Sequence, residues 1–199
     1  MQIKKEEVIN AILDSAENEF FNLGYDKASM RIIAKNANTT LGNVYNYFDS
    51  KEDLFSKIVD KPYNMMQGIF RNHNNSSKGD DLLERKDINS WRKKLKSILH
   101  DFLPMFTKPF VILIEGSTGT KYSHARDALV DLLAEHFHEH IQEYNKSYEN
   151  VELAPIFAEE LIDGVIKIIK NYDDINIQER LITEYVVFFA VGTMGILSN

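Results

Sequence analysis

Residues 24–55 read GYDKASMRIIAKNANTTLGNVYNYFDSKEDLF, and this stretch decides the fold that we predict. A short helix is predicted after Ser29, and a second is predicted over residues 41–47, which Thr40 is suited to cap. Polar residues between the two helices make a tight turn. Two short helices joined in this way form a helix-turn-helix, whose second helix presents side chains to the major groove of DNA.

Helical periodicity extends on both sides of this stretch. Apolar residues recur at helical spacing over residues 4–23, and Gly24 is expected to end that helix as a C-terminal cap. Residues 109–114 (PFVILI) are ambiguous, because an unbroken apolar run fits either a strand or a buried helix. The remaining periodic segments predict helices over residues 88–107, 123–147, 155–172 and 177–197.

A fourth helix is expected directly after the helix-turn-helix. Asp49 and Glu52 form one candidate capping box at its start. Ser50 and Asp53 form the alternative box. Pro62 is expected to kink or interrupt this helix, because proline removes a backbone hydrogen bond.

We therefore predict an all-α protein of two domains. An N-terminal three-helix domain with the helix-turn-helix binds DNA and occupies residues 1–61. A larger C-terminal helical bundle is expected over residues 62–199. The polar segment 72–87 is the one candidate linker of any length.

The composition fits a globular chain that lies outside membranes. Hydrophobic residues make up 44% and charged residues 27%, and the absence of cysteine excludes disulfides and thiolate metal sites. The N-terminus lacks the apolar run of a secretory signal. The longest apolar-rich run, residues 185–197, is shorter than the ~20 residues of a membrane-spanning helix. We expect a cytoplasmic protein without a membrane partner.

The charge distribution singles out one segment of the chain. A net charge of −7 argues against a general nucleic-acid coat, because Lys and Arg supply most non-specific affinity for phosphates. However, the 22 residues between Asp26 and Asp49 contain no acid and three bases, Lys27, Arg31 and Lys35. Such a face avoids repulsion from the phosphates of DNA.

The opening stretch also resembles the DNA-binding segment of the TetR family, over about residues 8–60. It departs from the family at Asn38 and Thr39, where Gly-Val is more frequent. The resemblance implies a transcriptional repressor that a small molecule releases from DNA, and a homodimer formed through a two-fold four-helix bundle. The features that carry it are Gly24-Tyr25, Ser29, Ile33-Ala34, Ala37, Gly42, Val44-Tyr45, Tyr47-Phe48, Ser50-Lys51 and Leu54.

The candidate DNA contacts divide into base readers and phosphate contacts. Ala37, Val44 and Phe48 should face the core, which leaves the polar side of the second short helix free for base edges. By resemblance, the hydroxyls of Tyr45 and Tyr47 bind phosphates. The alternative is that these aromatics form a small core and that the polar residues only face water. The full predicted set is Lys27, Ser29, Arg31, Thr39, Thr40, Leu41, Asn43, Tyr45, Asn46, Tyr47 and Lys51.

The C-terminal region offers weaker signals. The stretch FVILIEGSTGTK, residues 110–121, imitates a phosphate-binding loop, but Thr120 precedes Lys121 where such a loop requires glycine. His136 and His140 lie on one side of a helix, but no third metal ligand is identifiable, so no metal or other cofactor is predicted. Residues that could line an apolar ligand pocket are Trp91, His100, Phe102, Phe106, Phe110, Tyr122, Phe137 and His140.

The last two predicted helices are apolar on more than one side, which favours a subunit interface over a fully buried core helix. The predicted interface residues are Ile162, Val165, Ile166, Ile169, Tyr185, Phe188, Phe189, Gly192 and Gly195. A two-fold dimer would set two recognition helices about 34 Å apart, one turn of DNA, and so select a near-palindromic operator.

We expect a small apolar effector to change this separation and release DNA. A nucleotide-binding or enzymatic C-terminal domain is the alternative, but the sequence offers no nucleophile-base-acid set, so an enzyme is not expected. A dimer that binds DNA without any ligand is a third possibility.

Overall fold

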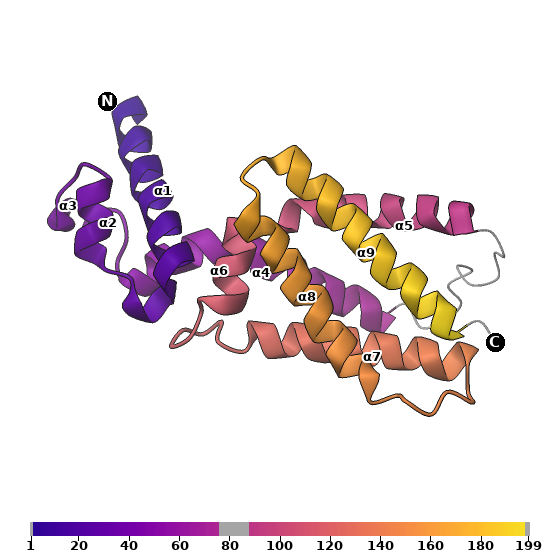
Figure 1. Ribbon diagram of the computed structural model, residues 1–199. Helices are drawn as coiled ribbons and strands as arrows, with labels where there is room; N and C mark the ends of the chain where they lie inside the picture. The colour runs from indigo at the N-terminus through magenta and orange to yellow at the C-terminus, as the bar shows by residue number, and fades with distance from the viewer. Residues whose placement is uncertain (1, 76–87, 198–199) are drawn as a thin grey trace. The chain divides into compact units, whose positions relative to one another are not determined.

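The computed structural model describes residues 2–75 and 88–197, which form helices joined by turns and loops, without a strand among them (Figure 1). The prediction of an all-α protein is therefore confirmed. The helices are α1 (Gln2–Lys27), α2 (Met30–Asn36), α3 (Leu41–Tyr45), α4 (Lys51–Asn75), α5 (Ile88–Phe102), η1 (Leu103–Met105), α6 (Lys108–Glu115), α7 (Ala125–Tyr144), α8 (Leu153–Asn171) and α9 (Ile175–Leu197).

The chain packs as two compact units. Unit 1 comprises Met1–Met65 and Thr107–Arg126, and unit 2 comprises Met66–Phe106 and Asp127–Asn199. Packing units and functional domains are different divisions, so the boundary between residues 61 and 62 stays a prediction.

Unit 1 is built around the buried stripe of α1. Ile12, Ala16 and Phe20 recur every fourth residue and are at most 1% exposed, because this spacing puts them on one face of a helix. Phe20 meets the ring of Phe55 from α4 edge to face, with centroids 5.0 Å apart. Helix α6 completes this core with five consecutive buried residues, Phe110 to Ile114. The ambiguous segment 109–114 is thus a helix that is covered on all sides.

Two glycines allow α1 and the end of α6 to meet. Gly24 has φ 72° and ψ 172°, a conformation that is essentially restricted to glycine, and α1 kinks there and continues to Lys27. The regular helical backbone that starts at Gln2 therefore ends at Gly24, as predicted, and the residues up to Lys27 form a further helical turn beyond the kink. The N–H of Tyr25 donates to the carbonyl of Gly116 at 2.7 Å. A Cβ at Gly116 would lie 2.9 Å from the carbonyl oxygen of Ile112, so a side chain does not fit there.

Helix α4 starts with the second of the two predicted capping boxes. Ser50 Oγ accepts from the N–H of Asp53 at 3.0 Å, and Asp53 Oδ2 accepts from the N–H of Asp49 at 3.1 Å. These bonds satisfy backbone donors that a helix start would otherwise leave without partners. The helix runs through Pro62 without the predicted interruption.

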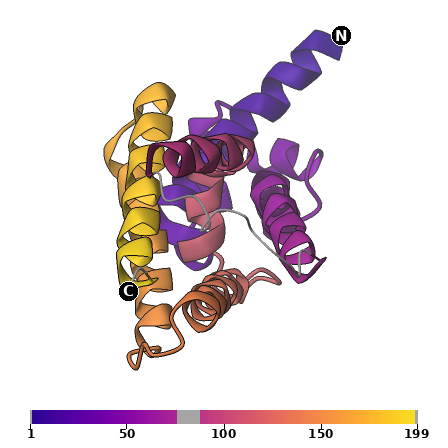
Figure 2. The same cartoon turned by 90° about the vertical axis from the view of Figure 1, so that its right-hand side faces the viewer.

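In unit 2, α8 and α9 lie side by side in both ribbon views (Figures 1 and 2). The hydroxyl of Tyr185 on α9 donates to the carbonyl of Glu160 on α8 at 2.7 Å. A Cβ at Gly164 would lie 2.1 Å from Cζ of Tyr185, so only glycine lets the tyrosine ring rest on α8 at this point. The apolar cluster of Phe137, Ala154 and Ala158 joins α7 to α8.

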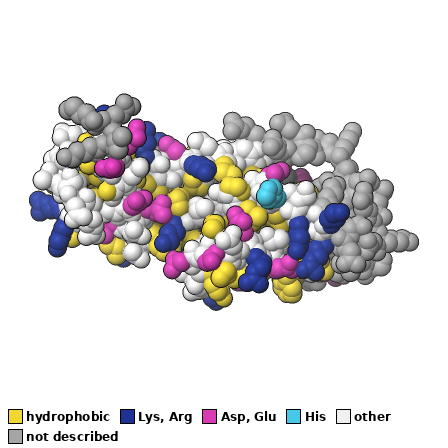
Figure 3. Space-filling model, turned by 90° about the horizontal axis from the view of Figure 1, so that it is seen from above, with side chains coloured by type: hydrophobic (Ala, Val, Ile, Leu, Met, Phe, Trp, Pro, Cys, Tyr) yellow, Lys and Arg dark blue, Asp and Glu magenta, His cyan; other side chains and the backbone are white. Residues whose placement is uncertain are grey.

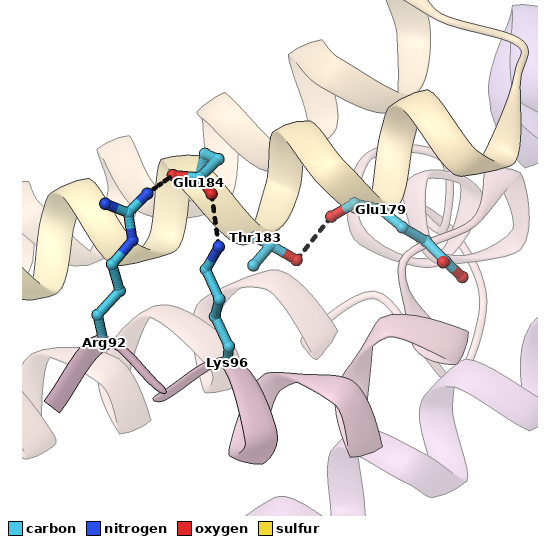
Figure 4. Close-up of polar contacts among 5 residues, drawn as sticks. All are labelled: Arg92, Lys96, Glu179, Thr183 and Glu184. Carbon is cyan, nitrogen blue, oxygen red and sulfur yellow. Dashed lines mark hydrogen bonds and ion pairs between the residues drawn. The ribbon is translucent and has the colours of Figure 1, made fainter. Parts of the chain in front are cut away.

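An ion-pair cluster links α5 to α9 on the surface of unit 2 (Figure 4). Glu184 binds the guanidinium of Arg92 and lies 2.7 Å from the ammonium of Lys96. All three side chains are more than 40% exposed, so water screens the attraction between them.

Among the described residues, no single helix is long and apolar enough to cross a membrane. One bent pair of segments, Leu95–Met105 and Lys108–Glu115, meets the requirements of length and composition together.

Candidate nucleic-acid interface

Helix α3 is anchored by one buried face. Val44 is 0% exposed, and Phe48 and Ala37 are 4% and 9% exposed, as expected for the core side of the helix-turn-helix. The turn before α3 needs Asn38 at φ 51°, a left-handed conformation that asparagine tolerates better than most residues. The N–H of Thr39 then donates to the carbonyl of Ala34 at 3.0 Å, which ties the turn to α2.

Polar side chains of the predicted base-reading set are linked to one another. Thr40 caps α3, because its Oγ1 accepts from the backbone N–H of Asn43 at 3.1 Å. The side-chain amide of Asn43 donates to Thr39 Oγ1 at 2.8 Å, and that of Asn46 points to Asn43 Oδ1 at 3.5 Å. Thr40 and Asn46 are exposed, whereas Thr39, Leu41 and Asn43 are half-buried.

The two tyrosines differ in their surroundings. Tyr45 is 47% exposed, so its ring is available to a partner. Tyr47 is half-buried, and Lys5 Nζ lies 5.9 Å from its ring centroid. The sequence analysis missed Lys5, because no local pattern connects the start of α1 with the end of α3. A cation at this distance extends the basic surface beyond the segment between Asp26 and Asp49.

Lys51 begins α4 and lies against α1. Its ammonium is 4.5 Å from the ring centroid of Tyr25 and 3.4 Å from the carbonyl oxygen of Asp26. Burial lowers the pKa of Lys51, while the carboxylates of Asp26 and Glu19 act in the opposite direction. The cation is therefore held in one place at the start of the helix, where the end of the helix dipole also favours an anion.

The start of α2 carries the remaining predicted phosphate contacts. Lys27 and Arg31 are exposed, and Ser29 is half-buried with its N–H bound to Glu19 Oε1 at 3.0 Å. Ser29 occupies the predicted N-cap position, but its side chain makes no capping hydrogen bond. Lys and Arg side chains lie at the left-hand end of the surface view, where the first ribbon view draws α2 and α3 (Figure 3).

The predicted effector residues are divided between the two units. Phe110 and Tyr122 belong to unit 1 and are 1% and 2% exposed. In unit 2, Phe137 is buried in its cluster and His100 is exposed, while Phe102 and Phe106 are half-buried. The side chains of Trp91 and His140 lie outside the described residues. In the described parts of the chain, no group of three or more histidine, aspartate or glutamate side chains could hold a metal ion.

The predicted interface residues separate into a buried and an exposed set. Ile162, Val165, Ile166 and Ile169 are at most 3% exposed, so the chain itself already covers them. Phe188 is 72% exposed and Ile156, which was not predicted, is 52% exposed. The surroundings of Gly195 lie outside the described residues. A surface hollow of about 450 Å³ is lined by Ile156, Phe157, Glu160, Tyr185, Phe188, Phe189 and Gly192.

Comparison with known proteins identifies the N-terminal region. Residues 12–58 match the model of the bacterial regulatory proteins of the tetR family. An uncharacterized HTH-type transcriptional regulator of Bacillus subtilis, YhgD, is 40% identical over 47 residues, which are 24% of this chain and 25% of the relative. The negative transcriptional regulator of the biofilm operon icaADBC in Staphylococcus epidermidis, IcaR, is 30% identical over 74 residues, 37% of this chain and 40% of the relative. The chain thus spans less than half the length of these relatives.

Solved structures extend the likeness to the whole fold. A TetR-like regulator from Rhodococcus sp. RHA1 is 16% identical with a TM-score of 0.50, over 92% of this chain and 94% of that one. A TetR family regulator from Chloroflexus aurantiacus is 15% identical with a TM-score of 0.51, over 99% of this chain and 89% of that one. At these identities the likeness supports the all-helical fold alone.

Proposed function

We propose that this chain is a transcriptional regulator of the tetR family, whose model its residues 12–58 match, and that it acts as a repressor. In this proposal a homodimer binds a near-palindromic duplex operator and a small apolar ligand releases it. The observation that carries the proposal is the two-sided character of α3: Val44 is fully buried, while Tyr45 and the two capping residues, Thr40 and Asn46, are exposed. A helix anchored in this way presents its polar side to base edges.

We assign the phosphate contacts to the exposed and partly exposed groups that flank α3. Tyr45 is the last residue of α3, and Tyr47 and Lys51 follow it in sequence. On the other side, Lys27 ends α1, and Ser29 and Arg31 lie at the start of α2. Phosphate contacts of this kind fix the position of the protein on the duplex, whereas Thr39, Thr40, Leu41, Asn43 and Asn46 are left for sequence selection.

The proposed dimer uses the exposed apolar side of α8 and α9. Phe188 and Ile156 expose more than half of their surface beside the hollow on these helices, which is costly in water unless a partner covers it. Binding to a near-palindromic operator would require the two recognition helices of the dimer to lie about one DNA turn, ~34 Å, apart.

The proposed effector is apolar, because the candidate pocket residues of unit 2 are aromatic. The half-buried rings of Phe102 and Phe106 keep part of their surface accessible, and His100 is exposed close to them in sequence. Release then requires that the effector bind more tightly to the form of the dimer that does not fit the operator.

The test begins with selection of duplex DNA by the full-length protein, followed by affinity measurements over a range of salt. The substitution Lys51→Met should weaken binding to every duplex and reduce the slope of log K against log salt by about 0.9, since one phosphate contact is lost. Lys57→Met is the matched control, because Lys57 is an exposed cation of the same helix that we assign no contact with DNA.

An unchanged salt slope in Lys51→Met, or an equal change in Lys57→Met, would contradict the assignment of Lys51. A selection that returns no preferred sequence would contradict the operator. Sedimentation of the protein should give a dimer, and a monomer at all concentrations would remove the proposed interface. Apolar compounds that bind the protein should lower its operator affinity, and an affinity unmoved by every bound compound would exclude ligand release.

A further inference from the structure

We propose that Thr39 is a positioning residue for DNA sequence selection: its hydroxyl orients the side-chain amide of Asn43, and through it that of Asn46, before DNA binds. This inference rests on the proposed role of Asn43 as a base reader. It assigns Thr39 a task within the protein in place of direct contact with the operator.

The backbone that carries the Thr39 side chain is held in place by hydrogen bonds of the turn. The backbone N–H of Thr39 donates to the carbonyl of Ala34 at 3.0 Å, and that of Asn38 donates to the carbonyl of Lys35 at 3.1 Å. Ala34 is 3% exposed, so this end of α2 is anchored in the core of unit 1. The turn before α3, and not α3 itself, therefore sets the position from which the Thr39 hydroxyl accepts a hydrogen bond.

The amide of Asn43 meets this acceptor. Its Nδ2 donates to Thr39 Oγ1 at 2.8 Å, a normal hydrogen-bond length, and its backbone N–H is already taken by Thr40 Oγ1. Both ends of the Asn43 residue are thus fixed, and its side-chain oxygen is turned away from the turn. That oxygen lies 3.5 Å from Nδ2 of Asn46, which extends the series by one more residue.

The series has a direction, because each amide donates toward the N-terminal side. If the Asn43 amide were reversed, its nitrogen would face the nitrogen of Asn46, and two donors would oppose each other. In this arrangement Asn43 Nδ2 is occupied by Thr39, so DNA can meet the side-chain oxygen of Asn46 and the second lone pair of Asn43 Oδ1 as acceptors. Acceptors in the major groove select bases with an amino group, adenine N6 or cytosine N4.

Fixing the amides before binding also reduces the entropy that is lost when DNA arrives. Without the hydroxyl of Thr39, the Asn43 side chain can rotate and present either its oxygen or its nitrogen. The structure thus predicts a loss of selectivity between bases, with little change in the affinity for DNA of unrelated sequence, because phosphate contacts do not involve Thr39.

The experiment compares binding profiles of wild type, Thr39→Val and Thr39→Ser on a library of operator variants, after melting curves have established that each protein is folded. Valine keeps the shape of threonine without the hydroxyl, whereas serine keeps the hydroxyl. We expect Thr39→Val to reduce the preference at the base pairs read by Asn43 and Asn46 by about 2- to 10-fold, the effect of one hydrogen bond. Thr39→Ser should keep the wild-type preference.

A double-mutant cycle with Asn43→Ala distinguishes positioning from direct contact. If Thr39 acts through Asn43, Thr39→Val should change the profile no further once Asn43 is alanine. An equal effect in both backgrounds would show direct contact by Thr39 and overturn the inference, as would a wild-type profile in Thr39→Val. A wild-type protein without any sequence preference would instead refute the proposed operator, and with it this inference.

Discussion

Replacing Tyr122 with phenylalanine removes one hydroxyl from the interior of unit 1 and leaves the ring in place. Tyr122 is 2% exposed, and its ring packs against Tyr63 and Phe55, with centroids 5.1 and 6.0 Å away. Its Oη donates to Asp60 Oδ1 on α4 at 2.5 Å. This bond fastens the loop after α6 to the helix that follows the helix-turn-helix.

The cost of the substitution Tyr122→Phe follows from that bond, because the apolar contacts of the ring are kept. A hydrogen bond to a charged group contributes about 1.5–3 kcal/mol to the free energy of unfolding. Asp60 is half-buried, so water can hydrate its carboxylate in the variant and reduce the loss. We therefore expect a loss near the lower end of this range, about 1.5 kcal/mol.

Hydrogen exchange can measure this loss in unit 1 by itself. Peptides from α4 and from residues 117–126 should open more readily in Tyr122→Phe by about 1.5 kcal/mol, whereas peptides from α8 in unit 2 should keep their protection. Tyr172→Phe is the control, since Tyr172 is 45% exposed. A change in unit 1 below about 0.5 kcal/mol, the usual effect of a surface substitution, would refute the reasoning.

The same variant makes a prediction about pH. Burial, followed by the hydrogen bond with Asp60, raises the pKa of Tyr122 above its ordinary value near 10. Because the folded state holds this proton more tightly, the contribution of Tyr122 to stability is present below about pH 10 and is lost as pH rises through the folded pKa. The stability difference between wild type and Tyr122→Phe should therefore shrink above about pH 10, and a constant difference would contradict this account.

Two further predictions concern a tight backbone contact and an exposed ion pair. Gly116→Ala should lower the free energy of unfolding by about 1–3 kcal/mol, because its Cβ would lie 2.9 Å from the carbonyl oxygen of Ile112. Gly42→Ala should leave the free energy of unfolding unchanged, because nothing lies within 4 Å of the added Cβ. Equal melting temperatures for the two variants would contradict this prediction, because they would show that the end of α6 shifts to make room for the added methyl group. Glu184→Gln should cost less than about 1 kcal/mol at low salt, because the side chain is exposed. The hydrogen bond from Lys96 lowers the pKa of Glu184, so this contribution is present above the ordinary glutamate pKa and is lost as pH falls. If the stability lost in Glu184→Gln were equally large in 1 M salt, this result would contradict an electrostatic origin of the loss.

Local patterns predicted most helices correctly. Thr40 caps α3 and Ser50 caps α4, because capping depends on residues only three positions apart. The segment 109–114 could not be assigned from its sequence, since a run of apolar residues has no period. In the structure it is a helix in which five consecutive residues, Phe110 to Ile114, are buried.

The candidate interface was predictable in its core and less so in its surroundings. The pattern of α3 alone indicated that Val44 faces inward and that Asn46 faces outward, as the structure has them. It gave no sign that Lys5 lies beside Tyr47 or that Lys51 lies on Tyr25, because these pairs join segments that are distant in sequence.

By itself, the sequence determined where helices begin, which of their faces are apolar, and which short helix is free of acids. Those properties depend on interactions within a few residues, which a linear pattern records. Only the tertiary structure decided what covers each apolar face: the chain's own helices cover Ile162 and its neighbours on α8, and the segment after Thr107 completes unit 1. A hydrophobic stripe in the sequence indicates that one face of a helix must be shielded from water. Which surface shields that face depends on the packing of segments that are distant in sequence.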